Sequence, residues 1–204
     1  NTQTTETSVT KIWEDKNNAD GNRPVSLTVK LNGEAYVLNA DNNWTVTVSD
    51  LPKYDENGNL ISYTWTEDDV PGYVLSGTKV DGTATTLSNS PTTQATVQKI
   101  WVDGENKDNT RPNALTVTLS NGTEVTLNEA NSWTATVQNL PKYENGQEIV
   151  YTWQETPAAG YTLIETKQNG TVTTLTNALN TEATVTKVWN DADNQDGKRP
   201  ASLI

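Results

Sequence analysis

The chain has 204 residues, a net charge of −12 and a sequence pI near 4.3, and it contains no Cys, His, Met or Phe. The missing cysteines exclude disulfides and thiolate metal sites, and the missing histidines remove the commonest general base and transition-metal ligand. The strong negative charge argues against nucleic acid or anionic membranes as partners. No apolar run is long enough for membrane insertion, and no signal peptide or anchor is visible, so we expect a piece of a longer protein.

Short alternating segments predict an all-β chain. They lie at 8–13, 27–31, 44–48, 62–67, 73–78 and 83–89 in the first part of the chain. Turn dipeptides separate them, namely Asn32-Gly33, Asn57-Gly58, Pro71-Gly72 and Asp81-Gly82. No segment of helical periodicity competes, and strands this short and this frequent predict a β-sandwich.

The chain repeats itself with a spacing of 88 residues, which separates Lys11 from Lys99 and Lys99 from Lys187. We therefore predict a first repeat over 6–91, a second repeat over 94–179 and the truncated start of a third repeat over 182–204. The joins, 90–93 and 178–181, are too short for free tumbling and predict a semi-rigid rod. The third part cannot bury a core alone, so we expect it to be disordered or docked on its neighbour.

Each complete repeat places three polar residues on apolar strand faces. Lys11 alternates in phase with Val9 and Trp13, and an ammonium on that face is costly unless it is paired or neutral. Glu67 follows two aromatic residues in phase, and Asn89 follows Leu87 in the same way. The corresponding residues of the second repeat are Lys99, Glu155 and Asn177.

This trio has the groups needed to form an amide bond. A buried lysine amine can be neutral and nucleophilic, and asparagine offers an electrophilic carboxamide. A buried carboxyl group can hold a proton at neutral pH, polarise the carboxamide and relay protons to the leaving ammonia. The product is a Lys–Asn amide without a buried charge. The alternative is a satisfied Lys–Glu ion pair beside an uninvolved asparagine.

The pattern VTKIW…RP…W…LPKY…YTWTE…GY…TLSN resembles the CnaB-type (collagen-adhesin B-type) repeat of Gram-positive surface proteins. The resemblance implies tandem inverse immunoglobulin-like (prealbumin-like) β-sandwich domains. It also implies a self-formed isopeptide bond between Lys11 and Asn89, assisted by Glu67. In the second repeat it implies the same roles for Lys99, Asn177 and Glu155. Lys187 matches the lysine position, but its partners are missing from this sequence.

Two other kinds of site receive less support. The acidic loops at 15–21, 103–108 and 191–197 hint at calcium, but none has the order of an EF-hand, so we predict polar loops without a metal or other cofactor. Arg23 and Arg111 are expected to orient these loops through hydrogen bonds. The tryptophans could serve carbohydrate binding, but most alternate in phase with aliphatic residues, which favours core packing.

A bond between the first and last strands of a repeat would carry tension past the chain between them. The sequence therefore predicts a structural stalk or spacer of a cell-wall-anchored, extracellular adhesin. Its expected partners are neighbouring repeats of the same polypeptide and, through other regions of the protein, host surface ligands. The alternative is an adhesin domain that binds a host matrix protein or glycan, and a pilin backbone subunit also stays open. We do not expect an enzyme, because the isopeptide reaction is a single turnover of the protein on itself.

Overall fold

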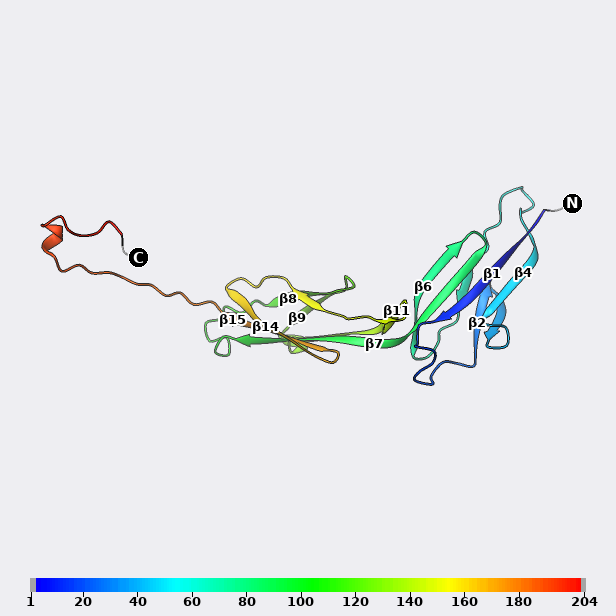
Figure 1. The fold of residues 1–204 in the computed structure, drawn as a ribbon, viewed down its shortest axis with the longest axis horizontal. Coiled ribbons are helices and arrows are strands. Elements are labelled where there is room, and N and C mark those ends of the chain that lie inside the picture. The colour runs from blue at the N-terminus through cyan, green and yellow to red at the C-terminus, as the bar shows by residue number, and fades with distance from the viewer. Residues whose placement is uncertain (1–2, 203–204) are drawn as a thin grey trace.

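The protein is all-β, and its strands form two sandwich units that follow one another along an elongated molecule (Figure 1). The computed structural model describes residues 3–202. The first repeat contains β1 (Thr4–Trp13), β2 (Ser26–Leu31), β3 (Glu34–Asn39), β4 (Thr45–Pro52), β5 (Trp65–Glu67), β6 (Tyr73–Asp81) and the start of β7 (Ala84–Val102). The second repeat contains the rest of β7, then β8 (Ala114–Leu119), β9 (Glu124–Asn128), the 3₁₀ turn η1 (Glu129–Asn131), β10 (Thr134–Pro141), β11 (Tyr143–Glu144), β12 (Gln147–Glu148), β13 (Trp153–Glu155), β14 (Tyr161–Asn169) and β15 (Val172–Leu179).

Each repeat packs two sheets over a hydrophobic core of its own. In the first repeat, one sheet has the order β6-β7-β1-β4 and the other the order β3-β2-β5. The alternation of β2 shows why the sheets pack: Leu27, Val29 and Leu31 are buried on one face, while the residues between them are half-buried. The core joins these leucines and valine to Val9 and Leu87 of the other sheet.

The second repeat has the same plan, with the sheets β14-β15-β7-β10 and β9-β8-β13. There β7 pairs antiparallel with β10 and parallel with β15, just as β1 pairs with β4 and β7 in the first repeat. The first and last strands of each repeat are thus parallel neighbours. This arrangement confirms the predicted tandem inverse immunoglobulin-like β-sandwiches.

The two repeats share a strand. β7 runs for 19 residues and is both the last strand of the first repeat and the first strand of the second. Its partners change between Pro91 and Thr92, where pairing with β6 ends and pairing with β10 begins. The segment 90–93, read from the sequence as a linker, is therefore part of a strand. Pro91 lacks an N–H, and a change of strand partners is a place where that loss is tolerated.

A hairpin of the second repeat, formed by β11 and β12, contacts the first repeat at this joint. The Tyr143 N–H donates to Ser90 Oγ at 2.8 Å, and the Gly146 N–H donates to Glu14 Oε2 at 2.8 Å. The Lys16 ammonium lies 4.8 Å from the Tyr143 ring centroid, a cation–π distance. Tyr143 is 7% exposed, whereas Tyr54, its counterpart in the first repeat, is 39% exposed. These contacts restrain the angle between the repeats.

The third segment, residues 180–202, forms no strand and extends away from the second repeat (Figure 1). Val185 and Val188 are 94% and 76% exposed, and the only regular element is the 3₁₀ turn η2 (Ala192–Asn194) within the described residues. The third segment is therefore not docked on the second repeat, which was one of the two arrangements expected from the sequence. A single strand without a partner cannot satisfy its backbone or bury its apolar face.

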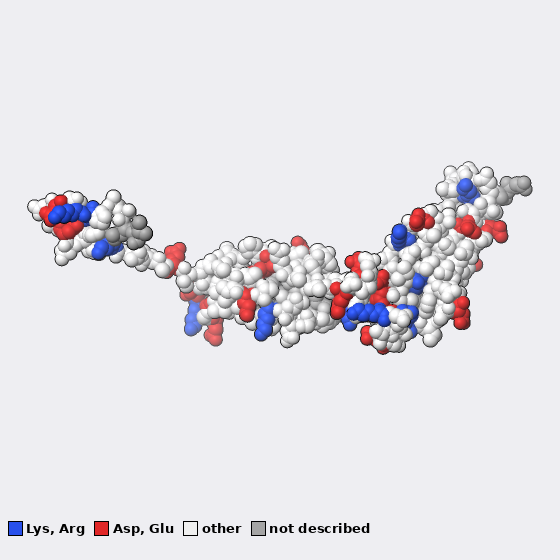
Figure 2. Space-filling view, in the orientation of Figure 1, with Lys and Arg blue, Asp and Glu red and all other residues white. Residues whose placement is uncertain are grey.

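Charged side chains are spread along the molecule rather than gathered in one continuous patch on the face seen in Figure 2. Acidic side chains outnumber basic ones, 26 against 14, over the whole sequence. Among the described residues, no helix has the length and hydropathy to cross a bilayer.

Candidate functional site

The lysine and the asparagine of each repeat lie on neighbouring parallel strands. β1 pairs with β7 so that Lys11 is opposite Leu87, and Trp13 is opposite Asn89. Lys11 and Asn89 are therefore two positions out of register, and both side chains belong to the buried face of the sheet. The same register joins the corresponding residues of the second repeat, which are Lys99 and Leu175, and Trp101 and Asn177.

The glutamate of each repeat comes from the opposite sheet. Glu67 ends β5, which pairs with β2, and Glu155 ends β13, which pairs with β8. Both strands begin with a buried tryptophan, and a side chain two residues later lies on the same face. The glutamate side chains are consequently only 8% and 6% exposed. The six residues predicted from the sequence therefore all point into the interior of their repeats.

In the first repeat, Lys11 and Glu67 form a buried ion pair. Lys11 Nζ donates to Glu67 Oε2 at 2.7 Å, and Lys11 as a whole is 4% exposed. Burial lowers the pKa of Lys11 from 10.5 to about 8, because the desolvation of the ammonium outweighs the hydrogen bond and the charge of Glu67. A substantial fraction of this amine is therefore neutral near pH 8.

In the second repeat, the glutamate lies between the other two residues. Glu155 Oε1 accepts a hydrogen bond of 2.7 Å from Asn177 Nδ2, and Lys99 Nζ is 3.0 Å from Glu155 Oε2. The second contact is ionic but poorly directed, since Oε2 accepts no hydrogen bond and Nζ donates instead to the Leu175 carbonyl at 3.2 Å. Burial lowers the pKa of Lys99 as well, against the opposing effect of Glu155.

The asparagine oxygens have no hydrogen-bond partner. Asn89 and Asn177 are each 1% exposed, and the Oδ1 atom of each accepts no hydrogen bond. An unpaired buried acceptor costs about 1–3 kcal/mol, and such atoms are rare in folded proteins. The same unpaired oxygen occurs in both repeats, beside a lysine of lowered pKa. Each repeat thus encloses a carboxamide with an unpaired oxygen, a lysine of lowered pKa and a carboxyl group in its interior.

Lys187 is not part of such a site within the described residues. It lies in the third segment, is exposed, and retains only the contact with Trp189, whose ring centroid is 4.8 Å from its Nζ. Its counterparts Lys11 and Lys99 have the same contact with Trp13 and Trp101, at 5.1 and 4.9 Å.

A second polar cluster recurs next to the trio. Arg23 donates to Asp15 through both Nε and Nη2, as expected for an arginine that orients its loop, and the Tyr73 hydroxyl donates to Asp15 Oδ2 at 3.1 Å. In the second repeat, Arg111 lowers the pKa of Asp103 to about 2. The sequence analysis did not assign this hydrogen-bonding role to the tyrosine, although the Gly-Tyr dipeptide that recurs in both repeats could have indicated it.

In the part of the chain that the structure describes, no three His, Cys, Asp or Glu side chains are placed to share an ion, and this includes the acidic loops. Asp15 and Asp103 are instead bound to arginine. The predicted core role of the tryptophans is confirmed: Trp65, Trp133 and Trp153 are buried, and the other tryptophans of the two complete repeats pack against the cores.

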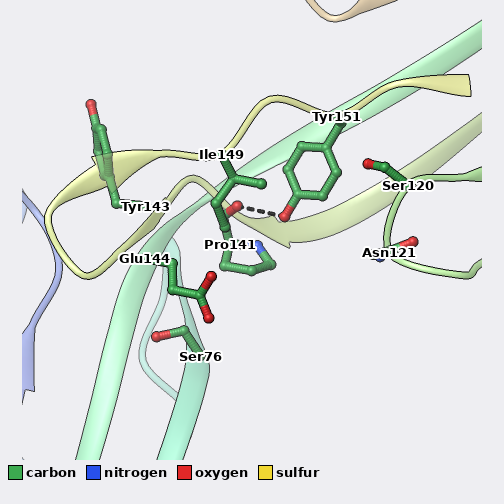
Figure 3. A pocket seen from close by; sticks show the side chains of 8 residues that line it. All are labelled: Ser76, Ser120, Asn121, Pro141, Tyr143, Glu144, Ile149 and Tyr151. Carbon is green, nitrogen blue, oxygen red and sulfur yellow. Dashed lines mark hydrogen bonds between the residues drawn. The ribbon is translucent and has the colours of Figure 1, made fainter.

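A cavity of about 250 Å³ lies at the joint between the repeats (Figure 3). Ser76 of the first repeat and Glu144 of the second meet at its edge, and the Tyr151 hydroxyl donates to the Pro141 carbonyl at 2.7 Å along its wall. None of the six trio residues lines this cavity. It is therefore separate from the candidate site.

Two β-sandwich repeats with a shared strand, each enclosing a Lys–Glu–Asn trio, define a tandem-repeat β-protein. The profile of one family, the Cna protein B-type domain, matches residues 7–90, 95–178 and 183–204. The chain belongs to this family.

Several similar proteins come from Staphylococcus aureus. The chain is 37% identical over 219 aligned positions to a collagen adhesin of that organism, and the match covers 98% of this chain but 18% of the adhesin. The crystal structure of two B repeat units of its collagen binding protein is 40% identical, covering 97% of this chain and 56% of that one, with a TM-score of 0.44. A single B repeat unit is 38% identical, covering 87% and 99% of the two chains, with a TM-score of 0.41. The chain thus spans about a fifth of the curated relative.

Proposed function

We propose that this chain is a stalk segment of a bacterial surface adhesin, and that each complete repeat forms its own covalent Lys–Asn cross-link. The observation that carries the proposal is the register of the first and last strands. Lys11 and Asn89 share one face of two parallel neighbours, and Glu67 reaches Lys11 from the opposite sheet. Membership of the Cna B-type family and the similarity to a staphylococcal collagen adhesin support a location on the outer, cell-wall-anchored surface.

The reaction requires a neutral amine, and burial of the lysine supplies one. The Lys11 pKa of about 8 leaves roughly a tenth of the amine neutral at pH 7. The amine nitrogen attacks Cγ of Asn89 and forms a C–N bond, the carboxamide C–N bond breaks, and ammonia leaves. The fold holds the reactants together, so an otherwise slow reaction becomes intramolecular.

The glutamate is placed to move the protons. In the first repeat it accepts a hydrogen bond from the amine, and in the second it accepts one from the carboxamide nitrogen. A carboxyl group that reaches both groups can take a proton from the attacking amine and deliver it to the leaving ammonia. In the second repeat the nitrogen that would leave as ammonia faces the carboxyl group, while the Asn177 oxygen is left without a partner.

The cross-links explain why the family would suit a stalk. The bond would join the first strand of a repeat to its last and bypass the 77 residues that lie between positions 11 and 89. Tension would then pass through covalent bonds without peeling strands from the sheet. In the chain-entropy treatment of cross-links, a loop of this size stabilises a domain by about 4 kcal/mol.

The first test is the intact mass of the denatured protein. We expect a deficit of two ammonia masses relative to the sequence, one for each complete repeat. A full mass would contradict the cross-links and leave buried ion pairs.

The stalk role is tested by stretching the pair of repeats in a single-molecule force experiment. Extension of either repeat by its bypassed loop would contradict it.

Because the relatives are named for collagen binding, a collagen-binding assay tests the stalk role against the ligand-binding alternative. Because this chain matches 18% of the adhesin, the ligand-binding part of that protein need not correspond to it. We expect the isolated pair of repeats to show no saturable binding to immobilised collagen. Saturable, specific binding would favour the ligand-binding alternative.

A further inference from the structure

The indole N–H groups of Trp13 and Trp101 are buried donors without an acceptor. Buried indole nitrogens usually find a hydrogen-bond partner. These two occur at the same position of two repeats, and in each repeat the asparagine Oδ1 is a buried acceptor without a donor. A complementary donor and acceptor are therefore left unpaired in both cores.

A third unpaired indole has a local explanation. In the first repeat, Trp65 Nε1 donates to Thr7 Oγ1 at 3.0 Å. The second repeat has Ala95 in place of that threonine, so Trp153 Nε1 has lost its acceptor. No such replacement accounts for Trp13 and Trp101, because their aromatic and lysine neighbours correspond in the two repeats.

Each of these two tryptophans adjoins both reacting groups. Trp13 is directly opposite Asn89 in the parallel pairing, and Trp101 is directly opposite Asn177, so each pair shares a face at the closest inter-strand position. The lysine ammonium lies over the same ring, at 5.1 Å from the centroid in the first repeat and 4.9 Å in the second. Edge-to-face packing against Tyr73 and Tyr161 fixes the rings.

We propose that Trp13 and Trp101 are catalytic residues of amide formation, and that their indole N–H binds the asparagine oxygen as it becomes negatively charged. This inference rests on the proposed Lys–Asn bond. When the neutral amine attacks Cγ, the C=O π electrons move to Oδ1, and the indole N–H donates to that oxyanion. The carbonyl re-forms as the C–N bond to the leaving nitrogen breaks, and the carboxyl group of the glutamate provides the proton that completes ammonia.

The unpaired state of the donor is what this role requires. A hydrogen bond made equally in the reactant and in the transition state does not accelerate a step. A donor that is buried and unpaired before reaction can form its bond as charge develops on the neighbouring oxygen. The oxyanion forms in a core that excludes water. A fixed donor stabilises its charge there more effectively than water would.

The test compares the two repeats within one chain. Trp101→Phe keeps an aromatic ring over Lys99 but removes the N–H, while the first repeat stays unchanged as an internal reference. The protein is made by cell-free translation and quenched in denaturant at successive times, and the loss of each ammonia is followed by intact mass. We expect the first loss at the normal rate and the second slowed about 10²-fold, the effect of removing one oxyanion donor.

Two further variants separate chemistry from packing. Trp133→Phe alters the ring that packs edge-to-face on Trp101 at 5.1 Å, and we expect it to leave the rate unchanged. Replacing Trp101 by benzothienylalanine, which has the shape of tryptophan but sulfur in place of the N–H, should reproduce the slow second loss even if Trp101→Phe folds poorly.

The outcomes distinguish this inference from the proposed function. If the isostere loses its second ammonia at the rate of the unaltered chain, tryptophan is not the oxyanion donor, and the Lys–Asn bond stands. If the unaltered chain itself loses no ammonia, the bond does not form, and the inference falls with it.

Discussion

Lys11 and Lys187 occupy nearly the same local sequence, VTKIW and VTKVW, yet only one of them lies in a site. Lys11 is 4% exposed, paired with Glu67 and lowered in pKa, whereas Lys187 is exposed in an extended segment. Both ammonium groups contact the tryptophan two residues later. The lysine–tryptophan contact is therefore local, while burial, ion pairing and the altered pKa require the other strands of the repeat.

The acidic loop that follows each of these lysines, by contrast, keeps its hydrogen bonds even outside a sandwich. In the third segment, Arg199 still donates through Nε to Asp191 at 3.0 Å, and its backbone N–H donates to Asn194 Oδ1 at 2.8 Å, as in the complete repeats. This loop forms without a sandwich around it. The comparison separates what a short sequence determines from what the fold adds.

Removing the carboxamide of Asn89 should prevent the bond that the fold makes available to Lys11, while leaving the lysine buried. In Asn89→Ala the Lys11–Glu67 pair remains, but the first repeat cannot close its bond. We expect a mass deficit of one ammonia rather than two, and a free energy of unfolding lower by about 4 kcal/mol for that repeat. Chemical denaturation with intact-mass analysis measures both. Lys187→Ala is the matched control. An equal loss of stability in that variant would contradict the view that only Lys11 lies in a reactive site.

Removing the proton carrier should slow the reaction without preventing folding. Glu155→Gln keeps the size of the side chain but cannot exchange a proton, so ammonia loss from the second repeat should slow about 10³-fold. The first repeat of the same chain serves as the reference, followed by time-resolved intact mass. Glu165→Gln, an exposed change in β14, should have no effect. A normal rate in Glu155→Gln would rule out the proton-transfer role.

Burial of Lys11 should also appear as a pH dependence of stability in the unlinked variant. In Asn89→Ala, the folded-state pKa of about 8 lies below the ordinary value of 10.5, so between these pH values the unfolded chain binds a proton that the folded chain lacks. The free energy of unfolding should therefore rise with pH across this window, by on the order of 3 kcal/mol. The measurement is urea unfolding at several pH values. Adding Lys11→Met should remove the rise, and an unchanged slope would contradict the assignment.

The smallest expected effect concerns the loop that forms locally. Arg111→Lys removes the two-pronged contact to Asp103, whose side chain is 1% exposed, and should destabilise the second repeat by about 1 kcal/mol. Arg199→Lys changes the same pair in the third segment, where both side chains are about a third exposed, and thermal unfolding should not detect it. Equal shifts of the unfolding temperature in the two variants would show that burial of the ion pair does not determine its contribution to stability.

Much of the fold could be predicted because period-two alternation is strong where one sheet face is buried. The segments predicted at 27–31 and 73–78 lie in β2 and β6, and Lys11, Glu67 and Asn89 are interior as their phase indicated. β3 was missed because its residues are mostly exposed or half-buried, which weakens the alternation.

Features that depend on partners were not predictable from one strand. Ser90-Pro91 indicated a linker, but pairing with β6 on one side and β10 on the other makes it part of β7. The unpaired Nε1 of Trp13 and the role of Tyr73 follow from which strands become neighbours, and alternation alone does not determine that.

The shared strand β7 also determines how little the molecule can stretch. Asn89 and Lys99 lie on it only ten residues apart, so with both bonds formed the force would enter β7 at one side chain and leave at the other. A strand already rises about 3.4 Å per residue, and a fully extended chain reaches at most about 3.6 Å. The free length between the two cross-links is then about 2 Å. With both bonds formed, this segment would have almost no compliance and would transmit a pull along its length rather than absorb it.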